Sequence, residues 1–433
     1  MSKLDHHSSS RSWQVSVQVI ERFLKSSPKL DELLSGGARH LPEGQVARVH
    51  FLSYGVVRHL GRLKALIAEV ARRPPKRMCQ ALLLVTIWEW LQSDDILKPK
   101  VVHHAVERAK ALLGEPESAF VNAVLRQLPK AVAREPDSRK SLPALARINS
   151  HPEWLLRRYG QRYGQRATAK WSQWNQRIPK IYCHILGDPT GLPEELIPTD
   201  WPGFYRVSGN LRNAAGNLLR DGRAYIQDPS TRLGPSLISG ERVRSILDLC
   251  AAPGGKSIHL LKCLEASGGL LVSVDLPGPR FDRMKMNLAR YGVEGVRKRQ
   301  IPADVLQLKG KDLPLEQFDC VYLDVPCSNS GVFQRRPDAK YRMGQDSLTR
   351  LIALQEKLIG AAARFVGPEG RLIYSTCSID FEENAGVVSR FLNRHGDRFR
   401  EVGRIISLPW ESGHDGCGAF ALKRLNPHVS QNA

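Results

Sequence analysis

Residues 246–257 read Ile-Leu-Asp-Leu-Cys-Ala-Ala-Pro-Gly-Gly-Lys-Ser, an apolar run followed by a loop of small residues with two adjacent glycines. A short run rich in Ile and Leu predicts a buried strand. The glycines that follow allow the backbone to approach a ligand closely where a helix begins. The stretch therefore predicts a strand, loop and helix that open an α/β sheet with a ligand at its carboxyl edge.

Alternating strands and helices continue from this stretch to the end of the chain. Short apolar runs predict strands at 246–249, 270–274, 320–323 and 372–374. Helical spacing between them predicts helices at 257–266, 280–291, 348–365 and 382–392. This order indicates a doubly wound, mostly parallel sheet.

The glycine loop also narrows the choice of ligand. A Walker-type phosphate loop needs a glycine where this chain has Cys250, and a dinucleotide GxGxxG motif is missing because Gly254 and Gly255 are adjacent. Asp275 ends the next predicted strand, where a carboxylate accepts hydrogen bonds from ribose hydroxyls. S-adenosylmethionine carries a ribose and no phosphate, so it fits this loop best. A tight structural turn is the alternative.

Two cysteines follow the next predicted strands. They lie in the phrases Leu323-Asp324-Val325-Pro326-Cys327-Ser328 and Tyr374-Ser375-Thr376-Cys377-Ser378. Two thiols at the same sheet edge suit a reaction that adds covalently to an aromatic ring and then reverses the addition. A single cysteine is more commonly a small buried apolar residue. That interpretation is kept for Cys79, Cys183, Cys263, Cys320 and Cys417.

The N-terminal part has a different pattern. Residues 11–128 show helical spacing, with helices predicted at 81–91, 101–113 and 119–128, and 131–141 indicates a linker. From His151 to about Pro198, arginines alternate with aromatic residues that include Trp154, Tyr159, Tyr163, Trp171 and Trp174. Such a segment suits phosphate binding and stacking on unpaired bases. A helix with an aromatic core face and a basic solvated face is the alternative.

Composition favours a polyanionic partner. The 433 residues include 64 Lys and Arg against 43 Asp and Glu, a formal net charge of +21. No apolar run approaches the length of a membrane span, and the cysteines form no CxxC pair. We expect a cytoplasmic nucleic-acid-binding protein with free thiols, no metal, no membrane association and a monomeric state.

Three ordered phrases together resemble one family. They are residues 250–257, residues 324–328 with Arg335-Arg336-Pro337-Asp338, and residues 375–378 with Glu382-Glu383-Asn384. They are similar to the RsmB/Nop2/Sun family of RNA cytosine-C5 methyltransferases. The helical part, including Asn122-Ala123-Val124-Leu125-Arg126, resembles the NusB-type domain of the bacterial RsmB-like branch.

The resemblance implies an organisation and a set of site residues. It implies a class I, Rossmann-like methyltransferase domain at 225–433, an all-α NusB-like RNA-binding domain at 1–140 and a connecting RNA-binding subdomain at 145–224. It implies Cys377 as nucleophile and Cys327 as the thiol that assists product release. Asp324 is our candidate to protonate the ring nitrogen N3. The implied S-adenosylmethionine site consists of Cys250, Ala251, Ala252, Pro253, Gly254, Gly255, Lys256, Asp275, Asp304 and Asp324.

These features predict an S-adenosylmethionine-dependent methyltransferase that acts on C5 of a cytosine in RNA, with ribosomal RNA as the expected substrate. The alternatives are a catalytically inactive RNA-binding assembly factor, a transfer RNA substrate, or methylation of DNA. For Asp304 a solvated loop carboxylate is the alternative, and for Lys256 a surface residue at a helix start.

Overall fold

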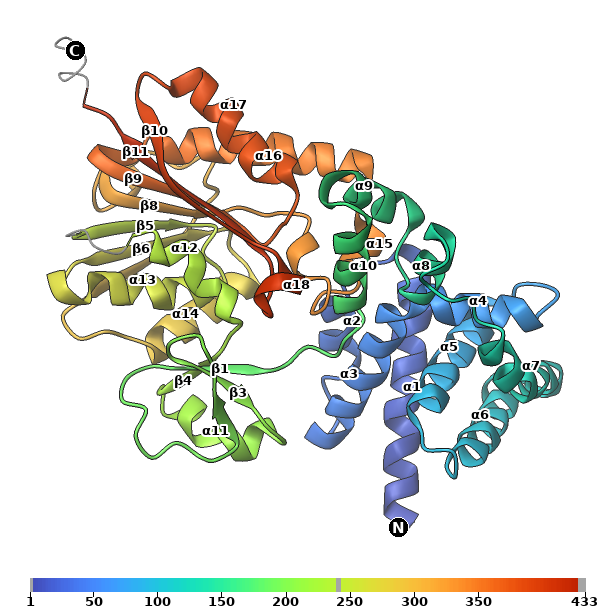
Figure 1. Cartoon of the computed structure of the whole chain (residues 1–433). Helices are drawn as coiled ribbons and strands as arrows, with labels where there is room; N and C mark the ends of the chain where they lie inside the picture. The colour runs from blue at the N-terminus through green and yellow to red at the C-terminus, as the bar shows by residue number, and fades with distance from the viewer. Residues whose placement is uncertain (1–2, 239–242, 427–433) are drawn as a thin grey trace. The chain divides into compact units, whose positions relative to one another are not determined.

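The computed structural model describes residues 3–238 and 243–426, with side chains described from residue 11 onward. The chain forms two units. One comprises residues up to Ile178 together with Phe333–Met343, and the other comprises Pro179–Val332 together with residues from Gly344 onward (Figure 1).

The first unit is helical. Its helices are α1 (Lys3–Ser26), α2 (Leu30–Gly37), α3 (Glu43–Arg58), α4 (Leu60–Val70), α5 (Arg77–Gln92), α6 (Lys98–Leu113), α7 (Glu115–Ala133), α8 (Leu142–Ile148), α9 (Glu153–Tyr163), α10 (Gln165–Trp174) and α15 (Ala339–Arg342). The predicted helices at 81–91, 101–113 and 119–128 lie within α5, α6 and α7.

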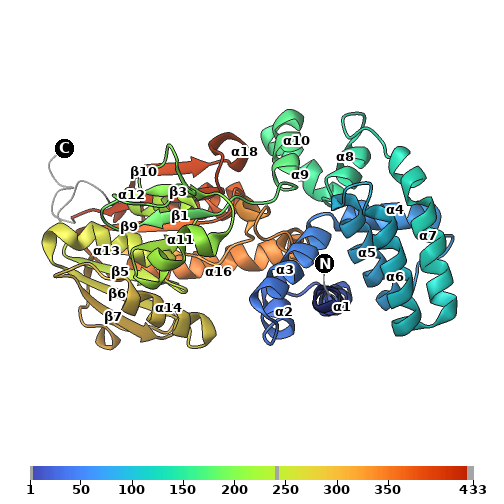
Figure 2. The same cartoon turned by 90° about the horizontal axis from the view of Figure 1, so that it is seen from below.

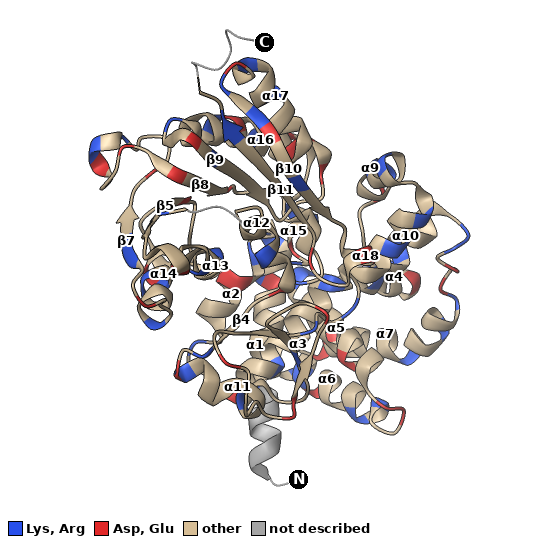
Figure 3. Ribbon diagram, turned by 60° about the vertical axis from the view of Figure 1, so that its left-hand side comes forward, with Lys and Arg blue, Asp and Glu red and all other residues tan. Residues whose placement is uncertain are grey.

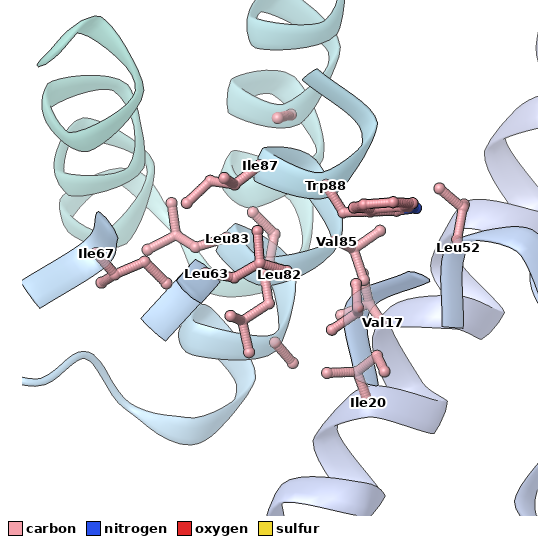
Figure 4. Packing of buried hydrophobic residues seen from close by; sticks show 14 of the residues in the cluster. Val17, Ile20, Leu52, Leu63, Ile67, Leu82, Leu83, Val85, Ile87 and Trp88 are labelled. Atoms are coloured by element: carbon pink, nitrogen blue, oxygen red, sulfur yellow. The ribbon is translucent and has the colours of Figure 1, made fainter. Parts of the chain in front are cut away.

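The core of this unit is built around α5. Almost every residue of α5 from Ala81 to Trp88 is buried, which is typical of a helix enclosed by others. Figure 4 shows Val17 and Ile20 of α1 pointing toward Val85 of α5. Polar residues fix some helix ends: the Ser141 hydroxyl accepts a hydrogen bond from the Ala144 amide at the start of α8. Between α9 and α10, Gly164 has φ +82°, a conformation that favours glycine.

A segment from the second half of the sequence completes this helical unit. Phe333–Met343 belongs to it, and Figure 1 shows α15 in orange beside the green helices α9 and α10. Tyr341 donates a hydrogen bond to the Ser150 carbonyl, and Lys340 donates one to the carbonyl of Arg58. The sequence does not predict this insertion.

The second unit begins with a small antiparallel sheet. Its strands are β1 (Tyr182–Ile185), β2 (Leu196–Pro198), β3 (Phe204–Val207) and β4 (Ala224–Ile226), in the order β2-β3-β1-β4, with α11 (Leu211–Arg220) alongside. Cys183, Ala214 and Ala224 form part of its buried core. The proposed division at 1–140, 145–224 and 225–433 remains a prediction. In the structure, α8 to α10 lie in the helical unit, and this small sheet lies in the other.

A larger sheet follows in the order β10-β11-β9-β8-β5-β6-β7, part of which Figure 2 shows from below. Its strands are β5 (Ser245–Leu249), β6 (Leu270–Asp275), β7 (Arg297–Pro302), β8 (Phe318–Asp324), β9 (Val366–Thr376), β10 (Phe399–Ser407) and β11 (Cys417–Arg424). Strands β5 to β9 pair in parallel, whereas β10 and β11 are antiparallel. The predicted mostly parallel sheet is confirmed.

Helices cover both faces of this sheet. They are α12 (Leu233–Ser236), α13 (Gly255–Leu264), α14 (Pro279–Arg290), α16 (Gln345–Ala363) and α17 (Ala385–His395), with the short α18 (Pro409–Ser412) before β11. Ile246 joins the core formed with α13 and α14, and its neighbour Leu247 joins the core formed with α16 and α17. Since successive strand residues point to opposite faces, the sheet is buried on both sides. The apolar strand runs thus reflect a doubly wound domain.

Candidate active site and cofactor loop

The candidate residues gather at the carboxyl ends of the parallel strands. Asp275 ends β6, Asp324 ends β8, and Asp304 follows β7 by two positions. Cys250 directly follows β5 and Cys377 directly follows β9. Since β5 to β9 are adjacent and parallel, these positions share one edge of the sheet.

The loop after β5 is tightly packed. Cys250 has φ +57° and Gly254 has φ +94°, and the Gly254 amide donates to the Ala251 carbonyl at 2.8 Å. A Cβ at Gly254 would lie 3.2 Å from Cγ of Met284, so any larger residue would strain the loop and displace its neighbour. Gly254 is therefore required by the fold of the loop itself.

A buried carboxyl group joins this loop's strand to the helix that follows. The Ser257 hydroxyl of α13 donates to Oδ2 of Asp248 in β5 at 2.5 Å. Burial raises the pKa of Asp248 to about 7. The start of α13 is thus held against β5.

Asp275 connects the loop to β6. Its Oδ2 accepts a hydrogen bond from the Ala252 amide at 2.8 Å, and its Oδ1 accepts one from the Leu276 amide at 2.7 Å. Asp304 accepts a hydrogen bond from the Leu306 amide at 2.9 Å, which forms a local turn. Both side chains are half-buried. Carboxylate oxygens accept more than one hydrogen bond, so both carboxylates retain capacity for ligand hydroxyls.

The residues of this edge fit S-adenosylmethionine. Three carboxylates (Asp275, Asp304 and Asp324) suit a ligand with ribose hydroxyls and positive charge. Lys256, the lysine of the loop, is engaged with Asp324 rather than placed to bind a phosphate. The small residues of the loop allow the close backbone approach that an adenosyl group needs.

Lys256 connects the loop to the ends of β8 and β9. Its Nζ donates to Oδ1 of Asp324 and, at 3.0 Å, to the hydroxyl of Ser375. The Lys256 side chain is only 15% exposed. Burial lowers the pKa of Lys256, but the attraction of Asp324, Tyr322 and Cys417 and the hydrogen bond with Asp324 together outweigh burial, so this pKa lies well above its ordinary value. A permanent cation thus lies beside Asp324.

The two cysteines face each other. Sγ of Cys327 and Sγ of Cys377 are 3.1 Å apart, and the Cys377 thiol lies 3.3 Å from Oδ1 of Asn329, which accepts from it. The hydrogen bond with Cys377, together with burial, raises the pKa of Cys327 well above its ordinary value. Cys327 is therefore held as a neutral thiol.

Glu383 holds the two cysteine loops together. Its Oε1 accepts from the Ser328 amide at 2.8 Å and from Gln355 at 3.0 Å. Its Oε2 accepts from the hydroxyls of Ser328 and Ser378, at 2.5 and 2.6 Å. Ser328 and Ser378 each follow one of the two cysteines. Glu383 lies within a motif of the sequence analysis, which gave it no role. The two serines, each directly after one of the two cysteines, were the sequence feature that could have indicated this role.

The aromatic segment near residue 160 is partly a core. Tyr159 is 2% exposed, Trp171 is fully buried, and their rings stack with centroids 4.2 Å apart. Phe333 also packs against Trp171. The prediction that these two rings stack on bases is wrong, because they fill the interior between α9, α10 and the inserted segment. Trp154 remains 41% exposed.

The five cysteines interpreted from the sequence as small apolar residues also have free thiols. Cys79, Cys183, Cys320 and Cys417 are buried and Cys263 is half-buried. In the described part of the chain, no group of three or more His, Cys, Asp or Glu is placed to hold a metal ion. Within the same residues, none of the helices is both long and apolar enough to span a membrane.

Comparisons with known proteins agree with this architecture. A family model described as 16S rRNA methyltransferase RsmB/F matches residues 237–430, and the NusB family model matches residues 8–130. The probable ribosomal RNA small subunit methyltransferase B of Bacillus subtilis is 29% identical, over 93% of this chain and 94% of its own length. The ribosomal RNA small subunit methyltransferase B of Pasteurella multocida is 28% identical over 95% of each chain.

Solved structures share the fold. The crystal structure of PH0851 superposes with a TM-score of 0.75 at 20% identity, covering 95% of this chain and 98% of that one. NSun6 from Pyrococcus horikoshii, solved with SFG, has a TM-score of 0.54 at 17% identity, covering 64% of this chain and 98% of that one. Residues 237–430 therefore match a methyltransferase domain of the RsmB/F type and residues 8–130 match a NusB-family domain, and curated relatives along most of the chain are named ribosomal RNA small subunit methyltransferase B.

Proposed function

We propose that this protein transfers a methyl group from S-adenosylmethionine to C5 of a cytosine in ribosomal RNA, through a covalent bond between Cys377 and C6 of the base. The observation that carries the proposal is the pair of thiols 3.1 Å apart at the ends of the adjacent strands β8 and β9. Cys377 can serve as the nucleophile that adds to the ring. A second thiol beside it suits a reaction that must also reverse the addition.

Cytosine C5 is a poor nucleophile, which explains the need for a thiolate. When Cys377 adds its sulfur to C6, the bond between C5 and C6 gives its electrons to the ring, and C5 becomes able to attack an electrophilic methyl group. The thiolate is the reactive form, so the Cys377 proton must leave before or during addition. The Asn329 side chain orients the Cys377 thiol in the free enzyme.

The negative charge that develops on the ring when the thiolate adds is neutralised by a proton at N3. We assign Asp324 to this task, because it ends β8 three positions before Cys327 and contacts the cation of Lys256. Asp324 donates its proton to N3 as the sulfur adds to C6, and Lys256 stabilises the negative charge that Asp324 then carries. Because Lys256 lies beside Asp324, protonation of the ring leaves no unpaired charge in the site.

Release of the product needs one more proton transfer. After methylation, C5 carries both the new methyl group and its original proton. As a water molecule takes that proton, its electron pair returns to the ring, the bond between C6 and sulfur breaks, and the departing Cys377 sulfur receives the proton of the neutral Cys327 thiol. We assign Cys327 to this stage, because its sulfur lies beside that of Cys377.

The cofactor residues follow from the loop geometry. We propose that the site consists of Cys250, Ala251, Ala252, Pro253, Gly254, Gly255, Lys256, Asp275, Asp304 and Asp324. When bound there, S-adenosylmethionine supplies an electrophilic methyl group. Asp275 and Asp304 orient the ribose by accepting its hydroxyl hydrogen bonds, and the alanines and glycines admit the adenosyl group.

RNA binding is assigned to the basic N-terminal regions. A cytosine stacked in a helix hides C5, so the base must be unpaired or flipped out to reach Cys377. We propose that the NusB-like domain at 1–140 and the connecting region at 145–224 bind the strand, in keeping with the net charge of +21.

The test is a product analysis. The full chain is incubated with methyl-labelled S-adenosylmethionine and with 16S rRNA, transfer RNA or DNA of matched concentration, and digested nucleosides are identified by mass spectrometry. We expect 5-methylcytidine from ribosomal RNA, and none from the Cys377→Ser variant. Cys263→Ser is the matched control, since Cys263 is half-buried in α13 and its thiol donates hydrogen bonds to backbone carbonyls, which a serine hydroxyl can also do.

Each other outcome contradicts a stated part of the proposal. A labelled cytosine nucleoside from transfer RNA or DNA alone would overturn the assignment of ribosomal RNA as the substrate. Failure of calorimetry to detect S-adenosylmethionine binding, with RNA binding retained, would indicate an inactive assembly factor instead.

A further inference from the structure

A cavity of about 600 Å³ lies within the helical unit, apart from the cysteine site. It is formed by residues 138–141, which precede α8, and by the helices α8, α9 and α10. Pockets of roughly 300 to 1,000 Å³ are typical of small-molecule and cofactor sites. The cavity is therefore large enough for one nucleotide, and the proposed reaction does not use it.

The wall of the cavity combines an apolar surface with a basic rim. Leu142, Leu145 and Leu156 contribute the apolar surface, and Lys140 and Arg157 lie exposed at the rim. No Asp or Glu lines the cavity. Among the described residues, neither Lys140 nor Arg157 takes part in a salt bridge. Arg139, by contrast, is paired with Asp137.

Amide side chains provide the polar part of the wall. Gln161, Gln165 and Gln173 line the cavity, and all three are exposed. An amide offers both a donor and an acceptor, which matches the mixed edges of nucleobases. Lys and Arg residues occur along α9 and α10 (Figure 3), so a polyanionic strand meets further positive charge around the cavity.

We propose that this cavity binds one unpaired nucleotide of the RNA substrate, with its base against the leucines and its phosphate against Lys140 and Arg157. The inference rests on the proposed function, because it takes the substrate to be RNA. The apolar surface suits the face of a base, and the cations suit a phosphodiester. An acidic peptide would match the charges but leave the leucine surface without a specific partner.

The nucleotide bound here is not the one that is methylated. The cavity is lined wholly by the helical unit, whereas the two thiols belong to the other unit. The site would therefore recognise a flanking unpaired nucleotide and increase affinity for RNA in which such a nucleotide is present.

The fold offers a variant that fills the cavity without breaking the helix. Gly160 lines the cavity within α9, and a Cβ added there would meet no atom within 4 Å. Leu has a higher helix propensity than Gly, so Gly160→Leu preserves α9 while occupying the space. Ala169→Phe adds bulk from α10 as an independent variant. Gly44→Leu in α3 is the matched control, because a Cβ at Gly44 also meets nothing within 4 Å and the residue is outside the cavity.

The test measures RNA affinity without turnover. Fluorescence anisotropy is recorded for the full chain with a labelled 16S rRNA fragment, over a series of salt concentrations. We expect Gly160→Leu and Ala169→Phe to weaken binding roughly 10- to 100-fold, as loss of one stacked base does. Arg157→Ala should weaken binding and reduce the slope of affinity against salt by about one ion, and Lys100→Ala on α6 serves as its charge-matched control. Binding of S-adenosylmethionine, measured by calorimetry, should be unchanged in every variant.

A second measurement locates the contact. Photocrosslinking of 4-thiouridine-substituted 16S rRNA should attach label to peptides of α8 to α10, and Gly160→Leu should abolish that label. RNA affinity in both filling variants equal to that of Gly44→Leu would overturn the proposal. So would cytidine monophosphate binding that is lost in the filling variants while RNA affinity is retained. A failure of the proposed cytosine methylation leaves these binding results unaffected, so the two proposals fail separately.

Discussion

Replacing Glu383 with Ala should disorganise both cysteine loops at once. The carboxylate is fully buried and accepts four hydrogen bonds, three of them from Ser328 and Ser378, the residues that directly follow Cys327 and Cys377. Two of the four donors are hydroxyls that can re-pair, since the Ser328 and Ser378 oxygens lie 3.3 Å apart. The Ser328 amide has no such alternative, and a buried donor without a partner costs about 1–3 kcal/mol.

The expected total combines these losses. The orphaned Ser328 amide, the weakened Gln355 contact and the cavity left by the carboxylate together cost about 3–5 kcal/mol of local stability. Displacement of the two sulfurs by about 1 Å would lower kcat by about 100-fold, because the attack on C6 depends on alignment. KM for RNA should change little, because Glu383 is too deeply buried to contact RNA.

Glu383→Gln keeps the shape of the side chain while removing its negative charge. An amide retains one acceptor for the Ser328 amide, and its NH₂ can donate to the two serine hydroxyls, so we expect a loss of only about 1 kcal/mol. Burial raises the pKa of Glu383 above its ordinary value. The folded state therefore binds the proton more tightly than the unfolded state. The stability that this proton contributes is complete at pH values below the pKa of Glu383 in the unfolded state. It is lost as the pH rises through the pKa of Glu383 in the folded state. Glu383→Gln should remove this dependence of stability on pH.

The assay is hydrogen exchange read by mass spectrometry, combined with steady-state kinetics. Because the chain has two units, a single unfolding transition would not isolate the effect, whereas peptides covering 325–332 and 377–384 report it locally. Glu316→Ala, at an exposed loop position, is the control. Unchanged exchange and unchanged kcat in Glu383→Ala would refute the positioning role.

Three further changes test neighbouring parts of the account. Gly331→Ala would place a Cβ 2.8 Å from the Cys377 carbonyl, so kcat should fall about 100-fold; Gly360→Ala in α16, where a Cβ meets nothing, should instead raise thermal stability by about 1 kcal/mol. Asp324→Asn should cost about 2–3 kcal/mol in chemical denaturation by leaving Lys256 without its counter-charge, and adding Lys256→Met should restore stability but not activity. Lys340 is 1% exposed, and burial lowers its pKa well below the ordinary value, so the unfolded state binds more protons and stability rises with pH up to the unfolded pKa. Lys340→Met should flatten that rise in melting curves, and an identical pH profile would contradict the assignment.

The sheet was predictable where its strands are buried on both faces. The runs around Leu247, Val272, Val321 and Ile373 are almost wholly apolar because helices cover both sides, so composition alone indicates a strand. Strand β7, whose sequence is Arg-Lys-Arg-Gln-Ile-Pro, was not predicted, because it lies at the sheet edge and its side chains are largely exposed.

The gathering of the candidate site residues at one edge of the sheet was predictable for a related reason. Parallel strands bring their carboxyl ends together, so Cys327 and Cys377 could be placed near each other from the strand pattern alone. The burial of Glu383 could not be predicted, because a buried carboxylate is indistinguishable in sequence from a solvated one. The same holds for Lys340, whose burial depends on the insertion of Phe333–Met343 into the helical unit. Periodicity near Tyr159 and Trp171 was compatible with both a core and a stacking surface, and only packing distinguished them.

The central claim is that the sulfur of Cys377 bonds to the cytosine ring. Cys327→Ala should leave that bond unbroken after methyl transfer, so the variant incubated with 16S rRNA and S-adenosylmethionine should accumulate a covalent protein–RNA complex. After nuclease and protease digestion, tandem mass spectrometry should place a methylated cytidine on the peptide that contains Cys377. A nucleotide attached to any other residue, or full methylation by a Cys377→Ala enzyme, would contradict the account.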